Sequence, residues 1–274
     1  RYGKNKKKNN ALSKVIFLGD SFTYGFGVNF KDSIPGIISK KIKNDYEVIN
    51  FAVPGYSPSM NYFKLREFLE QNISLRFSKI IYLLDLTDVH DEANRWQNIN
   101  SVNSPVIADQ VIEREIKKNF DLKKNFRTTR FIIYHINNYI RNAKKNIKKF
   151  FLNSETRKVD IRGTYWGSFT HTAHDKLLIN QNYSNHWKND IQFGLDKINL
   201  NIKEISKLAS KHNAEFYIAI HPWRETIDFG QNHFNWEKYA LNLCDMSNCK
   251  KLINFFDNVR EFKEINPDWK TQLY

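Results

Sequence analysis

The stretch VIFLGDSFTYGFG, Val15–Gly27, decides the fold and holds the first candidate site residue. Its apolar beginning, Val15–Leu18, is too short for a helix and starts with β-branched residues, so it predicts a buried strand of a parallel sheet. Gly19 lets the chain turn sharply where that strand ends. The turn places Ser21 at the carboxyl edge of the sheet, where open α/β sheets bind their ligands, and makes its hydroxyl a candidate nucleophile. The alternative is that Asp20 or Ser21 only caps the next helix.

Two further short apolar runs end in the same way. The run Val48–Phe51 leads into a turn in which the backbone N–H of Gly55 can contribute to an oxyanion hole. The alternative for this turn is an ordinary Pro-Gly loop between a strand and a helix. The run Ile80–Leu84 continues into Asp85-Leu86-Thr87-Asp88, for which the alternative is a buried strand followed by a capping aspartate.

Together, these three blocks resemble those of the SGNH (GDSL-type) hydrolases, esterases and acetyl-transfer enzymes built on a flavodoxin-like sheet. The resemblance extends from residue 14 to about residue 90 and resumes loosely at later strands. It implies that Ser21 is the nucleophile and that the N–H groups of Ser21 and Gly55 bind the oxyanion. Thr87 stands where the family has an asparagine, so its hydroxyl is the implied third donor. The resemblance implies no cofactor.

The catalytic base of that family lies in an Asp-x-x-His pattern after the last strand. No such pattern occurs in that region before Tyr274, so we expect the chain as given to lack that block and to be nearly inactive. Of the eight histidines, His221 is the best-placed internal candidate for the base, because it directly follows a predicted strand. An ordinary structural role for His221 is the favoured alternative. No histidine or cysteine spacing indicates a metal site.

The pattern as a whole predicts a three-layer α/β/α domain at residues 14–274, after a flexible basic arm at residues 1–13. The strand order 2-1-3-4-5 is implied by the resemblance. A helical insertion is expected at about residues 91–188, and a helix at 191–212 precedes the fourth strand. The five predicted strands cover residues 14–18, 46–51, 79–84, 214–220 and 251–256.

Positive charge is concentrated in two segments. The net charge is +14, of which residues 1–14 carry +6 and residues 113–158 carry +10, so the rest of the chain is slightly acidic. Residues 126–151 form an amphipathic basic helix in this interpretation. Packing on the core with a solvated basic face is the favoured alternative to contact with an anionic membrane surface or polysaccharide. No nucleic-acid recognition module occurs.

The two cysteines, Cys244 and Cys249, are close enough in sequence to form a disulfide. A disulfide favours an oxidising compartment, so we expect a periplasmic or membrane-anchored protein, with a cytoplasmic one as the alternative. No apolar run is long enough to cross a membrane.

Taken together, the sequence predicts acyl transfer through an acyl-serine intermediate, by a carbohydrate esterase or an O-acetyltransferase. The alternative is a non-catalytic module that binds carbohydrate or another surface on a degenerate SGNH fold.

Overall fold

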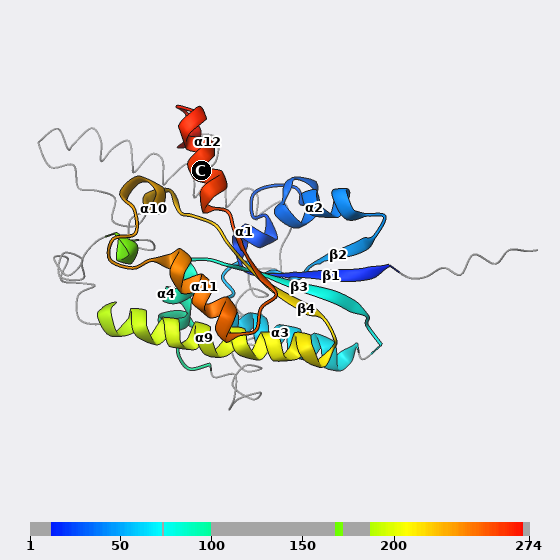
Figure 1. Ribbon diagram of the computed structural model, residues 1–274. Helices are drawn as coiled ribbons and strands as arrows, with labels where there is room; N and C mark the ends of the chain where they lie inside the picture. Colours follow the sequence, from blue (N-terminus) through cyan, green and yellow to red (C-terminus); the bar gives the residue numbers. More distant parts are fainter. Residues whose placement is uncertain (1–11, 73, 100–167, 172–186, 271–274) are drawn as a thin grey trace, which may run out of the picture. The chain divides into compact units, whose positions relative to one another are not determined.

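A computed structural model describes residues 12–72, 74–99, 168–171 and 187–270. Its strands form one parallel sheet in the order β2-β1-β3-β4-β5 (Figure 1). This confirms the predicted fold class and strand order. The strands are β1 (Ser13–Leu18), β2 (Tyr46–Asn50), β3 (Phe77–Leu84), β4 (Glu215–Ile220) and β5 (Lys251–Asn254).

Helices cover both faces of the sheet. In Figure 1, α1 (Ser21–Tyr24) and α2 (Ile34–Ile42) lie on one side. On the other side lie α3 (Pro58–Gln71), α9 (Trp187–Lys211) and α11 (Trp236–Met246). The shorter elements and the last helix are η1 (Phe30–Asp32), α4 (Thr87–His90), η2 (Asp91–Arg95), η3 (Ser168–Thr170), α10 (Arg224–Phe229) and α12 (Phe256–Ile265).

The three central strands are buried, as the apolar runs predict. Ile16 pairs in register with Ile80, and Ile80 with Phe216 on the next strand. Strands covered on both faces read as continuous apolar runs, which is why these segments lack polar alternation. The fully buried side chains of these strands include Ile16, Leu18, Ile80, Tyr82, Leu84, Ile218 and Ile220.

Each predicted strand has one boundary that differs from the observed one by one or two residues. The last strand ends at Asn254 rather than residue 256, because the side chain of Asn254 accepts a hydrogen bond from the Phe256 N–H at 3.0 Å and starts α12 there. The first strand begins at Ser13, a residue that the sequence assigned to the basic arm. Helix α9 contains most of the predicted helix at 191–212 and begins earlier, at Trp187.

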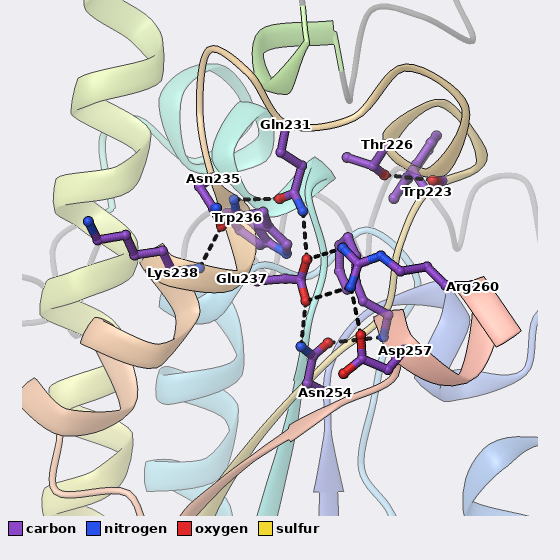
Figure 2. Close-up of polar contacts among 11 residues, drawn as sticks. Trp223, Thr226, Gln231, Asn235, Trp236, Glu237, Lys238, Asn254, Asp257 and Arg260 are labelled. Atoms are coloured by element: carbon purple, nitrogen blue, oxygen red, sulfur yellow. Dashed lines mark hydrogen bonds and ion pairs between the residues drawn. The ribbon is translucent and has the colours of Figure 1, made fainter.

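A polar network holds the last strand and helix together (Figure 2). Glu237, in the first turn of α11, accepts hydrogen bonds from Gln231 at 2.8 Å and from Asn254 at 2.7 Å. Arg260 of α12 forms ion pairs with Glu237 and with Asp257. The network therefore fixes α11 and α12 to the carboxyl end of β5.

A disulfide links Cys244 and Cys249, as the sequence predicted. The basic helix predicted at 126–151 and most of the insertion at 91–188 lie outside the described residues. Residues 91–99 of that segment are described, and there Trp96 and Ile99 are buried in the core. In the described part of the chain, no helix is both long and apolar enough to span a membrane.

Candidate active site

Ser21 lies where the Gly-Asp-Ser turn was expected to place it, at the start of α1 and directly beyond the carboxyl end of β1. Gly19 has a φ of +147°, and a Cβ at this position would lie 3.0 Å from the backbone oxygen of Leu83. Only glycine lets the chain turn so close to the neighbouring strand. Asp20 caps α1 by accepting a hydrogen bond from the Phe22 N–H at 2.9 Å. Ser21 is half-buried at the resulting edge.

Gly55 lies in the loop that follows β2. This loop is fixed to the Ser21 turn, because the Val53 N–H donates to the backbone oxygen of Gly19 at 3.2 Å. Asn50, the last residue of β2, donates through its amide to the backbone oxygens of Thr23 and Tyr24 in α1. Gly55 has a φ of +78°, which also favours glycine. The two residues predicted to supply backbone oxyanion donors therefore belong to connected turns.

Thr87 starts α4, just after β3, but its polar groups are turned toward Asp85. Its N–H donates to Oδ1 of Asp85 at 2.7 Å, and its hydroxyl donates to the same oxygen. This local turn is typical of an aspartate at the end of a strand. To act as an oxyanion donor, Thr87 would have to exchange its hydroxyl bond with Asp85.

His221 directly follows β4 and forms an ion pair with Asp85. Its Nε2 lies 2.9 Å from Oδ2 of Asp85, and the indole N–H of Trp223 donates to that oxygen, also at 2.9 Å. Burial by itself would lower the pKa of His221, but Asp85 raises it above the usual histidine value. Burial opposes ionisation of Asp85 as well, yet its hydrogen bonds with His221 and Thr87 lower its pKa. The pair is therefore a buried carboxylate and an imidazole that readily binds a proton.

The site contains further carboxyl groups whose protonation is shifted. Burial, with the charge of Asp85, raises the pKa of Asp20 to about 7. Burial raises the pKa of Asp91 to about 7 and that of Asp88 well above its usual range. Perturbed groups of this kind at a sheet edge are typical of functional sites.

The strand order explains why these groups meet. Strands β1 and β4 each pair with β3, so Asp85 lies between Ser21 and His221 at the carboxyl edge. The ring of Phe22, next to Ser21, lies 4.5 Å from the His221 ring between centroids. Among the described residues, Ser21 Oγ has one hydrogen-bond partner, Oδ2 of Asp20 at 3.5 Å. Ser21 and His221 therefore lie in one neighbourhood, without a hydrogen bond between them.

The other described histidines take different positions. His90, in α4, contacts Asn94, and burial lowers its pKa to about 4. His171 packs its ring against Phe229. The sequence interpretation missed the pairing of Asp85 with His221. The sequence does contain a signal for this pairing, because Asp85 and His221 both directly follow buried strands.

Comparisons with known proteins give structural neighbours only. No family model matches the chain, and no curated protein matches it. Among solved structures, AlinE4, an SGNH-hydrolase family esterase, is 9% identical with a TM-score of 0.45, covering 93% of this chain and 82% of that one. The psychrotrophic esterase EstA from Pseudoalteromonas sp. is 10% identical, with a TM-score of 0.42 and coverage of 94% and 86%. The acetyl xylan esterase AlAXEase is 13% identical, with a TM-score of 0.43 and coverage of 93% and 84%.

Likenesses at such low identity and TM-score carry no argument about fold or activity, so the fold is judged from the strand order and the first turn. The sheet order is the one that the SGNH resemblance implies, and Ser21 occupies the turn after the first strand. By these criteria, the described residues form a three-layer α/β/α fold with the strand order that the SGNH resemblance implies.

Proposed function

We propose that the protein is an ester hydrolase that acts through an acyl intermediate on Ser21. The observation that carries this proposal is the convergence of Ser21, Asp85 and His221 at one edge of the sheet, with His221 ion-paired to Asp85 at 2.9 Å. A serine needs a neighbouring base to become a nucleophile, and a base needs a third group to orient it. These three residues supply the three required groups, with His221 in the role of the base that the sequence pattern places after the last strand. The proposal therefore replaces the expectation that the chain as given is nearly inactive.

The reaction follows from these roles. Ser21 Oγ forms a bond with the ester carbonyl carbon, and its proton passes to Nδ1 of His221 while Nε2 stays with Asp85. The bond to the alcohol oxygen breaks, and the departing alcohol takes that proton. Water then attacks the acyl-serine with His221 as base, releasing a carboxylic acid and restoring Ser21.

In the described structure, Nδ1 of His221 lies 3.3 Å from the backbone oxygen of Pro222. That contact suits the protonated ring, in which both nitrogens are donors. When the ring loses one proton, Nε2–H can remain with Asp85, which leaves Nδ1 as the acceptor. Ser21 Oγ would then have to leave Asp20 and turn toward Nδ1 to complete the hydrogen bond. Catalytic hydrogen bonds of free enzymes often form only when substrate binds.

For the substrate, we propose an acylated saccharide. Apolar surfaces pack against acyl groups or sugar rings. The segment just after Ser21 offers such a surface through its exposed side chains Phe22, Tyr24, Phe26, Val28 and Phe30. Water as the acceptor makes the protein a carbohydrate esterase, and a sugar hydroxyl makes it an O-acetyltransferase.

We also propose an extracytoplasmic location, supported by the disulfide.

A non-catalytic binding module is the second candidate. It is favoured by the bond of Ser21 Oγ to Asp20 rather than to His221. Such a module would bind a saccharide without turning over esters.

Kinetics with p-nitrophenyl acetate separate the two candidates. Ser21→Ala is expected to lower kcat by at least about 10³-fold with an unchanged melting temperature, because a nucleophile is lost without a packing change. Ser74→Ala, at an exposed serine before β3, is the matched control and should keep wild-type rates. Turnover by Ser21→Ala within about tenfold of wild type would exclude Ser21 as the nucleophile.

A further inference from the structure

Besides the N–H groups of Ser21 and Gly55, the proposed reaction calls for a third donor to the oxyanion. Thr87 occupies the corresponding position in the sequence, but both its N–H and its hydroxyl donate to Asp85. Asp85 is needed as a carboxylate for His221, and removing a donor from a buried carboxylate costs free energy. A different donor close to Gly55 would avoid that cost.

Arg95, at the end of η2, lies directly beside Gly55. A Cβ built on Gly55 would lie 2.2 Å from Nη1 of Arg95 and 3.1 Å from its Cζ. The guanidinium therefore occupies the space that a side chain at position 55 would need. Five N–H donors and a permanent positive charge make such a group a strong ligand for a developing oxyanion.

The position of Arg95 is set by its neighbours, although its side chain is exposed. The guanidinium lies over the ring of Trp96, 4.7 Å from the centroid, and the indole N–H of Trp96 donates to the backbone oxygen of Gly55 at 3.1 Å. Trp96 thus contacts both Arg95 and the loop that carries Gly55. Stacking of arginine on an aromatic face favours one orientation of its planar group.

A buried ion pair fixes the η2 segment that carries Arg95. Oε2 of Glu92 lies 3.0 Å from Nζ of Lys197 on α9, and Oε1 accepts hydrogen bonds from the hydroxyl of Ser57 at 2.8 Å and the N–H of Ser59 at 2.6 Å. Lys197 also donates to the backbone oxygens of Glu92 and Trp96. The η2 segment and the Gly55 loop are therefore linked on both sides of Arg95. Pre-organised donors of this kind need no reorganisation during the reaction.

From this arrangement, we propose that Arg95 is a catalytic residue that donates to the oxyanion formed during acyl transfer to Ser21. It takes the donor role that the sequence pattern assigned to Thr87. This inference rests on the proposed function. Arg95 forms no covalent bond and transfers no proton. It stabilises the negative charge on the former carbonyl oxygen together with the N–H groups of Ser21 and Gly55.

The test compares Arg95→Met and Arg95→Lys with wild type, using p-nitrophenyl acetate, a neutral ester. Arg95→Met is expected to lower kcat about 10²-fold and to change KM by less than about threefold, because the lost interaction exists only in the transition state. Arg95→Lys, which keeps the charge but loses the fork geometry, should fall between the two. The matched control is Arg76→Met, which removes an exposed arginine before the amino end of β3 and should leave both parameters unchanged.

A second variant separates this role from simple charge balance. The charge of Arg95 lowers the pKa of the nearby Asp91, so its loss could act through that carboxyl group. If Arg95 only neutralised Asp91, the double variant Arg95→Met/Asp91→Asn would recover wild-type kcat. We expect the double variant to stay as slow as Arg95→Met.

The outcomes also distinguish this inference from the proposed function. Wild-type rates for Arg95→Met, a change confined to KM, or recovery in the double variant would each overturn the role of Arg95. The reaction of diisopropyl fluorophosphate with Ser21 in wild type would show that the proposed function still stands in those cases. If wild type itself neither turns over the ester nor reacts at Ser21, the proposed function fails, and the role of Arg95 fails with it.

Discussion

At the residue scale, Asp85 organises the candidate active site. Its two oxygens accept hydrogen bonds from Trp223 and from both polar groups of Thr87, and one of them forms the ion pair with His221. A buried carboxylate with this many donors stays ionised, and an ionised Asp85 favours the protonated form of His221. The base is therefore oriented, and its protonation depends on pH.

The first prediction is a pH profile. Because Asp85 raises the pKa of His221, the ring loses its proton only above the usual histidine value of about 6.5, and kcat/KM should rise through an apparent pKa above that value. The measurement is kcat/KM for p-nitrophenyl acetate from pH 5 to 9. A profile without a rise above pH 6.5 would contradict the role of His221 as base.

The second prediction concerns Asp20. Its pKa is raised to about 7, mainly by burial and then by Asp85. Ionised Asp20 therefore destabilises the folded state, and this destabilisation grows as the pH rises from about 4 to 7. Asp20→Asn keeps an oxygen for the Phe22 N–H and removes the charge. The variant should gain about 1–3 kcal/mol of unfolding free energy at pH 8, with a smaller gain at pH 5. Urea unfolding at both pH values measures this, and an equal gain at both would contradict the stated cause.

The sequence predicted some of these residues because their signals are local. Gly19 and Gly55 mark turns after apolar runs, and those turns have the positive φ values that favour glycine. The pairing of Asp85 with His221 joins residues that are far apart in the chain, and it follows only once β4 is known to pair with β3. The engagement of Thr87 and the position of Arg95 depend on side-chain orientation, which no spacing rule provides.

At the scale of elements, the short helical segment after β3 connects the site to the long helix α9. Glu92 is fully buried and Lys197 is 5% exposed, and together they join η2, α3 and α9. Sequence periodicity placed α9 but gave no sign that it carries a buried lysine. Breaking a buried ion pair leaves one uncompensated charge, whereas removing both charges avoids that penalty.

The third prediction is a double-mutant cycle on this pair. Glu92→Gln and Lys197→Met should each lower the unfolding free energy by about 3–5 kcal/mol, and the double variant should lose less than the sum of the two. Urea unfolding gives all four values. The exposed pair Lys207–Glu204 is the control, and its removal should leave the melting temperature nearly unchanged. Strictly additive losses at Glu92 and Lys197 would mean that the two charges do not interact.

At the scale of the whole molecule, the sheet order brings the candidate residues to one edge. The strands were predictable because buried parallel strands read as short apolar runs between polar turns. Their order is not contained in those runs, and it came from the family resemblance before the structure confirmed it. The basic segments at 1–11 and 113–158 lie outside the described residues, so contact with an anionic surface stays a prediction.

The measurement that tests the central claim most directly is covalent labelling of the 274-residue chain with diisopropyl fluorophosphate, followed by intact mass and peptide mapping. We predict one phosphoryl adduct on Ser21, formed faster at pH 8 than at pH 6 and absent from Ser21→Ala. The His221→Ala variant should react at least about tenfold more slowly, because its serine lacks the base. No adduct on the folded wild-type protein, or an adduct at another residue, would contradict the account.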